Sequence, residues 1–295
     1  MTDNKNPVVE SFFDIVSSTV SYVVSDPISR AAAVIDPVLD FRAADGRISS
    51  ASVDRLLDHV RAQKLEVRYV LETHVHADHL SGAQLIKAAT GAPVVTGEQV
   101  CQVHAMFAPQ FFPGMASSIC FDHLVTDGEM LPLGGLDIEV LHTPGHTPAC
   151  VSYRIGDAVF VGDALFMPDF GTARADFPGG DASSLFHSIR RLLSLAPETR
   201  MFVGHDYKAA DRDAFAWETS VDEQRRANVH VRDGVDEAAF VAVRRARDMT
   251  LDPPAQLLAS LQVNIRAGRL PPPDADGVVR LRWPLTGWER LGGLI

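Results

Sequence analysis

Metal-binding side chains crowd into one short stretch of this chain, the segment Thr73–His79. Its four polar members that can bind a metal are His74, His76, Asp78 and His79. Imidazole nitrogens and carboxylate oxygens are the usual protein ligands of zinc and non-haem iron. In an extended turn, residues i and i+2 project to the same side, so His74 and His76 can reach one centre. The spacing predicts a metal site directly after a strand.

Three shorter motifs add one His or Asp each at the end of a further expected strand. They are Thr143-Pro144-Gly145-His146-Thr147, Gly162-Asp163 and Gly204-His205. A single Gly-Asp or Gly-His pair after a strand is usually only a turn. Three such motifs, in this order after the His-rich segment, indicate that His146, Asp163 and His205 converge with it.

The hydrophobic pattern predicts the elements that position these residues. Short apolar runs bounded by turn residues predict strands, and apolar residues at helical spacing predict helices. The expected strands are a hairpin over 11–24 and the runs 31–35, 67–71, 93–96, 136–141, 150–155, 158–161 and 201–203. The expected helices are 50–64, 81–90, 181–195, 215–228, 237–248 and 254–266.

This order of elements is β-rich with interleaved helices and becomes helical toward the C-terminus. It favours an α/β fold in layers, an αββα sandwich with a helical C-terminal extension, over one doubly wound sheet. We expect a catalytic domain over residues 1–250 and an extension over 251–295 packed on the same domain. The Phe-containing segment 101–120 is interpreted as a lid, a dimer contact or ordinary packing. Some strand character is expected over 278–288.

Composition excludes several classes of protein. With 27 Lys and Arg against 38 Asp and Glu, the net charge is -11, which argues against a nucleic-acid or anionic-membrane partner. No apolar run approaches the ~18 residues that a membrane span requires. The three cysteines are too few for a disulfide framework, and the N-terminal residues lack the apolar core of a secretion signal. We therefore expect a cytoplasmic protein, and we expect a homodimer.

The four motifs THVHADH, TPGHT, GDALF and GHDY resemble those of the metallo-β-lactamase superfamily from about residue 10 to residue 210. Within it, the chain is most similar to the persulfide dioxygenases, which are related to glyoxalase II. This narrower resemblance is carried by TPGHTPACVSY, by FVGDALF and by the loop Gly171–Phe177, which contains an Arg-x-Asp-Phe element. The resemblance implies the αββα sandwich, with the metal at one edge of its two sheets.

The same resemblance implies one Fe(II) per chain, held by His74, His146 and Asp163. Two His and one carboxylate on one face of the ion leave three positions open, as in non-haem iron oxygenases. Other residues would orient the ligands or, in dinuclear zinc relatives, bind the second metal; they are His76, Asp78, His79 and His205. Asp78 and His79 are also the candidate catalytic residues, because they can hold water near the metal.

The implied reaction converts glutathione persulfide, O2 and water to glutathione and sulfite. Glutathione carries carboxylates, so Arg174, Tyr207 and Arg225 are the candidate substrate-binding residues, and Asp176 is expected to orient Arg174. The alternative is a zinc-dependent hydrolase with one or two zinc ions, either a glyoxalase II-like thioesterase or another hydrolase of this fold. A non-catalytic protein that keeps the fold is a third possibility, against which the intact ligand set argues.

Overall fold

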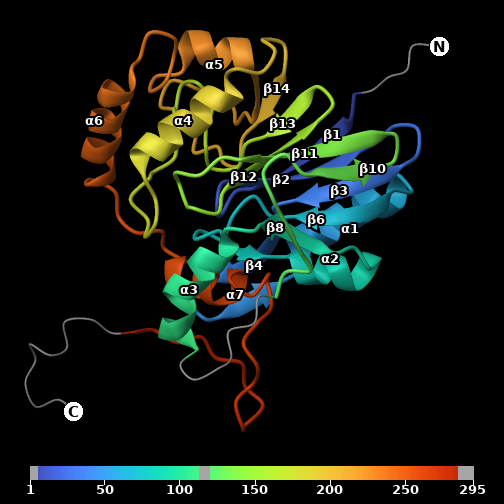
Figure 1. Ribbon diagram of the computed structural model, residues 1–295. Helices are drawn as coiled ribbons and strands as arrows, with labels where there is room; N and C mark the ends of the chain where they lie inside the picture. The colour runs from blue at the N-terminus through green and yellow to red at the C-terminus, as the bar shows by residue number, and fades with distance from the viewer. Residues whose placement is uncertain (1–5, 113–119, 285–295) are drawn as a thin grey trace, which may run out of the picture.

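Two β-sheets packed face to face, with helices on both outer sides, make up the protein in the computed structural model (Figure 1). The structure describes residues 6–112 and 120–284. In Figure 1 the helices α4, α5 and α6 lie on one side of the strands, and α1, α2, α3 and α7 lie on the other. The expected αββα sandwich is therefore confirmed. Among the described residues, no helix is long and apolar enough to cross a membrane.

The first sheet contains six strands in the order β1-β2-β3-β6-β8-β9. Their bounds are β1 Val8–Asp14, β2 Thr19–Ser25, β3 Ala31–Ile35, β6 Glu66–Leu71, β8 Val94–Gly97 and β9 His123–Val125. The β1-β2 hairpin is antiparallel, whereas β3, β6, β8 and β9 run parallel. Parallel strands end at one edge of a sheet, and the loops that follow β3 and β6 therefore meet there.

The second sheet also contains six strands, in the order β10-β11-β12-β13-β14-β15. Their bounds are β10 Met130–Leu133, β11 Leu136–His142, β12 Val151–Ile155, β13 Ala158–Phe160, β14 Arg200–Phe202 and β15 Glu218–Ser220. Strands β13 and β14 are parallel, so the loops after them also leave from one edge. A three-stranded sheet, β5-β4-β7, is formed by β5 Arg47–Ser49, β4 Val38–Arg42 and β7 Leu80–Ser81.

The helices cover the outer faces of the sandwich. They are α1 Ala51–Ala62, α2 Ala83–Thr90, α3 Val100–Phe111, α4 Ala182–Leu192, α5 Val221–Ala227, α6 Glu237–Asp248 and α7 Leu257–Asn264. Helix α2 ends before Gly91 at φ 78°, the left-handed cap that glycine adopts without strain. The Asp181 side chain caps α4 by accepting a hydrogen bond from the Ser184 amide.

Three apolar layers hold the sandwich together. The central layer lies between the two sheets and includes Tyr22, Tyr153 and Phe160, all almost fully buried. A second layer joins α1, α2, α3 and α7 to the first sheet. A third layer joins the helices α4, α5 and α6 to the second sheet. Strands β3 and β13, which are buried along their whole length, read in sequence as continuous apolar runs rather than alternating ones.

The structure contains elements that the sequence analysis did not expect, namely β4, β5, β7, β9, β10 and α3, and it differs from two expected elements near the C-terminus. The helix expected over 215–228 begins only at Val221, because Glu218–Ser220 pairs with β14 as an edge strand and the Ser220 side chain then caps α5. No strand forms over 278–284, and the rest of the stretch expected to have strand character lies outside the described residues. The segment 101–120 begins as α3, and residues 113–119 likewise lie outside the described part.

Candidate metal centre

The His-rich loop leaves the end of β6 and is fixed at its start by Asp36, which follows β3. One Asp36 oxygen accepts a hydrogen bond from the Thr73 amide at 2.7 Å, and the other accepts from the Thr73 hydroxyl at 2.8 Å. Sequence reasoning treated Asp36 only as the end of a strand. The sequence did contain a signal for this contact. A buried strand that ends in Asp places a carboxylate at one edge of the sheet, and the loop that follows the neighbouring parallel strand leaves from the same edge.

Hydrogen bonds to one ring nitrogen of His74 and of His146 leave the other nitrogen free to bind a metal. The Thr73 hydroxyl, having donated to Asp36, accepts from His74 Nδ1 at 3.0 Å. The Arg174 carbonyl can only accept, so His146 Nδ1, at 2.8 Å, carries the proton. Each ring then presents an unprotonated Nε2, the tautomer that a metal ligand needs.

Asp163 follows β13 and completes this group of three. Its Oδ2 lies 3.9 Å from His74 Nε2 and 3.6 Å from His146 Nε2. All three side chains are buried, and their potential ligand atoms lie within 4.8 Å of one another. Within the described part of the chain, His74 Nε2 and Asp163 Oδ1 have no hydrogen-bond partner. Buried polar atoms without partners are costly, and their convergence fits a metal ion.

A second group of possible ligands borders the first and shares Asp163. His205 Nε2 lies 3.4 Å from Asp163 Oδ1 and 3.6 Å from Asp78 Oδ2. His79 Nδ1 lies 3.1 Å from the same Asp78 oxygen, and its Nε2 has no hydrogen-bond partner among the described residues. Asp163 therefore lies between the two groups, and the donor set can hold one ion or two.

His76 is held from behind by two buried carboxylates. Its Nε2 lies 3.0 Å from Asp36 Oδ1 and 3.2 Å from Glu72 Oε2, whereas its Nδ1 lacks a hydrogen-bond partner in the described structure. A carboxylate behind a His ring fixes its orientation and makes the opposite nitrogen a better ligand. Glu72, which the sequence interpretation missed, also accepts a hydrogen bond from the Ser81 hydroxyl.

Burial and neighbouring charge shift several pKa values at this centre. Burial, reinforced by His76 and His146, lowers the pKa of His74 well below its usual range. Burial alone would raise the pKa of Asp78, but His205 and His79 outweigh it and lower that pKa well below its usual range. His74 is therefore neutral and Asp78 is ionised near neutral pH, as ligands and proton acceptors require.

The glycines of the short motifs allow the loops to approach one another. A Cβ on Gly204 would lie 2.9 Å from Asp163 Oδ1. Gly162, at φ 49°, adopts the left-handed region, and a Cβ there would lie 2.7 Å from the Thr73 hydroxyl. A side chain at either position would push the ligands apart, which explains the Gly before Asp163 and before His205.

The loop containing Arg174 is packed against His146. Besides the bond from its carbonyl to His146 Nδ1, the loop places the Phe177 ring edge-on to the His146 ring, with centroids 5.1 Å apart. The Arg174 guanidinium donates to both oxygens of Asp176, at 2.6 and 2.8 Å, and to the Asp252 carbonyl at 2.7 Å. Asp176 orients Arg174 as expected, but these contacts use the guanidinium to hold chain segments together.

A buried ion pair on α6 anchors the same loop. Arg244 and Asp248 lie 2.7 Å apart, with side chains 3% and 6% exposed. Arg244 donates to the Thr172 carbonyl at 2.9 Å, and Asp248 accepts from the Ala175 amide at 3.0 Å. Helix α6 is thereby connected through residues 172–175 to His146, a candidate metal ligand.

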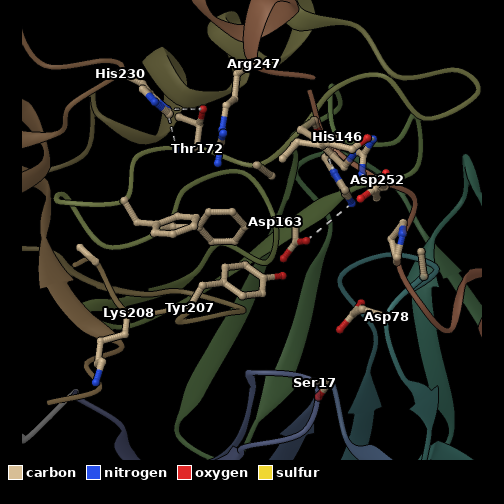
Figure 2. A pocket seen from close by; sticks show the side chains of 18 of the residues that line it. Ser17, Asp78, His146, Asp163, Thr172, Tyr207, Lys208, His230, Arg247 and Asp252 are labelled. Atoms are coloured by element: carbon tan, nitrogen blue, oxygen red, sulfur yellow. Dashed lines mark hydrogen bonds and ion pairs between the residues drawn. The ribbon is translucent and has the colours of Figure 1, made fainter. Parts of the chain in front are cut away.

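An open cavity of about 760 Å³ lies above the metal centre. Its lining includes His146, Asp163 and Asp78, so a bound molecule can reach the metal. Figure 2 shows Tyr207 with its hydroxyl directed toward Asp163. Volumes of about 300–1,000 Å³ are usual for small-molecule sites.

The three candidate substrate-binding residues differ in their placement. Arg174 and Tyr207 line the cavity. Arg225 is not among the lining residues, and its guanidinium extends from the exposed surface of α5 to pair with Asp233 at 3.0 Å. The structure thus gives no contact that supports a substrate role for Arg225. Sequence reasoning missed Arg247, a lining residue from α6, because no motif marks it.

An αββα sandwich with a His- and Asp-rich centre at the strand ends defines a metal-dependent enzyme class. The sequence model of the "Metallo-beta-lactamase superfamily" matches residues 15–205. The chain therefore belongs to the metallo-β-lactamase superfamily.

Relatives within this superfamily differ in the activity that their names state. A "probable metallo-hydrolase" of Burkholderia pseudomallei is 49% identical over 94% of this chain and 98% of its own length. "Glyoxylase B2" of Dictyostelium discoideum is 41% identical over 94% and 97%. The crystal structure of ETHE1 from Myxococcus xanthus matches with 33% identity and a TM-score of 0.71, over 89% of this chain and all of that chain.

Proposed function

We propose that the protein is a non-haem iron dioxygenase that oxidises glutathione persulfide to sulfite. The observation that carries the proposal is the group His74, His146 and Asp163, two imidazoles and one carboxylate on one side of an open cavity. Such a set leaves several metal positions free for two reactants. The similarity to ETHE1 of Myxococcus xanthus supports it, because the curated ETHE1 proteins of mammals are named persulfide dioxygenases.

The proposed reaction is glutathione persulfide plus O2 and water giving glutathione and sulfite. The two atoms of O2 and the oxygen of water become the three oxygens of sulfite, and the outer sulfur is transferred from the glutathione sulfur. The iron would supply the electron transfer that O2 chemistry needs and that side chains alone cannot provide.

The chain's own residues hold the metal and handle protons. His74, His146 and Asp163 would hold the iron, and the hydrogen bonds to Thr73 and Arg174 keep the two imidazoles in the ligand tautomer. Asp78, ionised and lining the cavity, would accept a proton from the reacting water, with His79 next to it at 3.1 Å. Tyr207 would close one wall of the cavity over the persulfide.

One experiment separates this proposal from its main alternative. Protein purified anaerobically should contain about one iron per chain and consume O2 when glutathione persulfide is added. Sulfite and glutathione should appear in equal amounts. Absence of O2 uptake by fully iron-loaded protein would show that the proposal is wrong.

A glyoxalase II-like zinc hydrolase is the second candidate. Two observations favour it: the second ligand group around His205, Asp78 and His79, and the His76 Nδ1 atom that has no hydrogen-bond partner among the described residues. With these groups beside the first, the centre could hold two zinc ions. It predicts two metals per chain and hydrolysis of S-lactoylglutathione without O2. A cytoplasmic location and a homodimer remain predictions.

A further inference from the structure

The cavity above the metal centre is lined by four long cationic side chains, of which two are fully engaged by the protein. Arg174 is held by Asp176 and the Asp252 carbonyl. Arg244 is held by Asp248 and the Thr172 carbonyl. Neither guanidinium can turn to a ligand without losing these bonds, and Arg244 is almost completely buried.

The third cation, Lys208, is directed elsewhere. Its ammonium lies over the Phe215 ring, 5.6 Å from the centroid, and 3.5 Å from the Asp213 carbonyl oxygen. Figure 2 shows the Lys208 side chain running away from Asp163 and Tyr207. It therefore contributes only a distant positive charge to the cavity.

The fourth cation, Arg247, is free. Over residues 6–112 and 120–284, its guanidinium makes no hydrogen bond or ion pair, and the residue is exposed. Figure 2 shows Arg247 extending from α6 into the cavity. Arg247 follows Arg244 by three positions on the helix, so both face the cavity, while Arg245 is not among the lining residues.

Neighbouring groups leave the Arg247 charge unopposed. His230 accepts a hydrogen bond from the Thr172 amide at 3.1 Å, and its pKa is lowered to about 4 by burial and then by Arg244 and Arg247. The carboxylate of Asp169 is paired with Arg212 at 2.7 Å. Asp252 also lines the cavity, but Figure 2 places it beside His146 rather than beside Arg247.

We propose that Arg247 binds a terminal carboxylate of the thiol tripeptide whose sulfur faces the metal centre. This inference rests on the proposed glutathione-based substrate. A guanidinium presents two parallel N–H donors to a carboxylate, which gives orientation as well as affinity. Arg247 would thereby replace Arg174 and Arg225 as the anchor of the substrate.

Calorimetric titration of the metal-loaded, anaerobic protein with glutathione tests the subsite without turnover. Arg247→Ala removes a charged hydrogen bond to the ligand and should weaken binding about tenfold or more. Arg245→Ala, on the same helix outside the cavity, should bind as the wild type does. Arg247→Lys should be intermediate, because it keeps the charge without the paired donors.

Glutathione ethyl ester, blocked at the glycine carboxylate, identifies the bound group. If the ester binds the wild type weakly and Arg247→Ala weakens it no further, Arg247 binds the glycine carboxylate. If the two losses add, Arg247 binds the γ-glutamyl carboxylate.

The inference is overturned if Arg247→Ala binds glutathione as tightly as Arg245→Ala does, or if the wild type does not bind millimolar glutathione. Failure of the proposed function looks different. In that case Arg247-dependent binding of glutathione would persist although iron-loaded protein consumed no O2.

Discussion

His146 Nδ1 donates to the backbone carbonyl of Arg174 over 2.8 Å, and this bond joins a candidate metal ligand to a loop that α6 holds in place. The Arg-x-Asp-Phe element was expected to bind substrate through its Arg side chain. In the structure its backbone orients His146, its Phe177 ring packs against the imidazole, and its guanidinium is used within the protein. The element therefore acts first on the metal centre.

Loss of the Arg174 side chain should weaken metal binding. Arg174→Ala removes the contacts to Asp176 and the Asp252 carbonyl, so the loop that orients His146 becomes looser. Changes behind a ligand typically cost about 10–100-fold in metal affinity. Competition with a chromogenic chelator measures this, and Arg225→Ala, whose side chain is on the surface away from the cavity, is the matched control. Equal affinities in the two variants would contradict the role assigned to Arg174.

The buried pair Arg244–Asp248 should be needed for stability. Asp248→Asn leaves the Arg244 charge buried without its carboxylate, and breaking such a pair costs about 3–5 kcal/mol. Urea unfolding should show this loss. The double variant Arg244→Met with Asp248→Leu should recover part of it, because no charge then remains buried. A single variant as stable as the wild type would show that the pair is dispensable.

The C-terminal helix α7 should be required for an ordered metal loop. Buried Asn264 donates to the carbonyls of His76 and His79 at 2.9 and 2.7 Å and accepts from the Ser81 amide at 2.8 Å. Asn264→Ala leaves these buried groups unsatisfied, at about 1–3 kcal/mol for each. We expect a lower melting temperature and faster hydrogen exchange over residues 76–81. Arg266→Ala, at a half-buried position just beyond α7, is the control.

Substitution of single ligands should distinguish one metal from two. If one iron is bound by the first group, His74→Ala, His146→Ala and Asp163→Ala should each lose it, because only three side chains hold the ion. His205→Ala should retain about one iron per chain. Metal analysis by mass spectrometry reads this directly. Two metals in the wild type, with one lost in His205→Ala, would favour the hydrolase.

His230 should make the fold sensitive to mild acid. Its pKa, lowered to about 4 in the folded protein, is near 6.5 in an unfolded chain, so the unfolded state binds a proton first as pH falls. The stability that neutral His230 contributes is full above about pH 6.5 and is lost toward pH 4. Because the ring is partly exposed, we expect about 1–2 kcal/mol rather than the ~3 of full burial.

The comparison that isolates this effect is the wild type against His230→Asn over the same pH range. The metal ligands titrate alike in both proteins, so the difference between the two unfolding free energies reports His230. That difference should shrink between pH 6.5 and 4. A constant difference would show that His230 has the same pKa in the folded and the unfolded protein.

The grouping of the candidate ligands could be predicted from the sequence because it depends on local patterns. An apolar run followed closely by a His or Asp gives both a strand and a polar group at its end, and four such motifs in order specify the sheet edge where they meet. Metal binding is then expected, because several His and Asp side chains at one point are typical of metal sites and uncommon elsewhere. The strands around His74, His146 and Asp163 were accordingly predicted within a few residues.

Only the tertiary structure decided which groups support those ligands and which cations face the cavity. Asp36, Glu72 and Asn264 reach the metal loop from strand ends and from a helix far away in sequence, and no local period marks such contacts. The sequence alone does not show that the Arg174 and Arg247 side chains have different partners. Packing places Arg174 against Asp176 and Asp252 and leaves Arg247 without a partner among the described residues, because the partners of a charged side chain depend on which elements fold beside it.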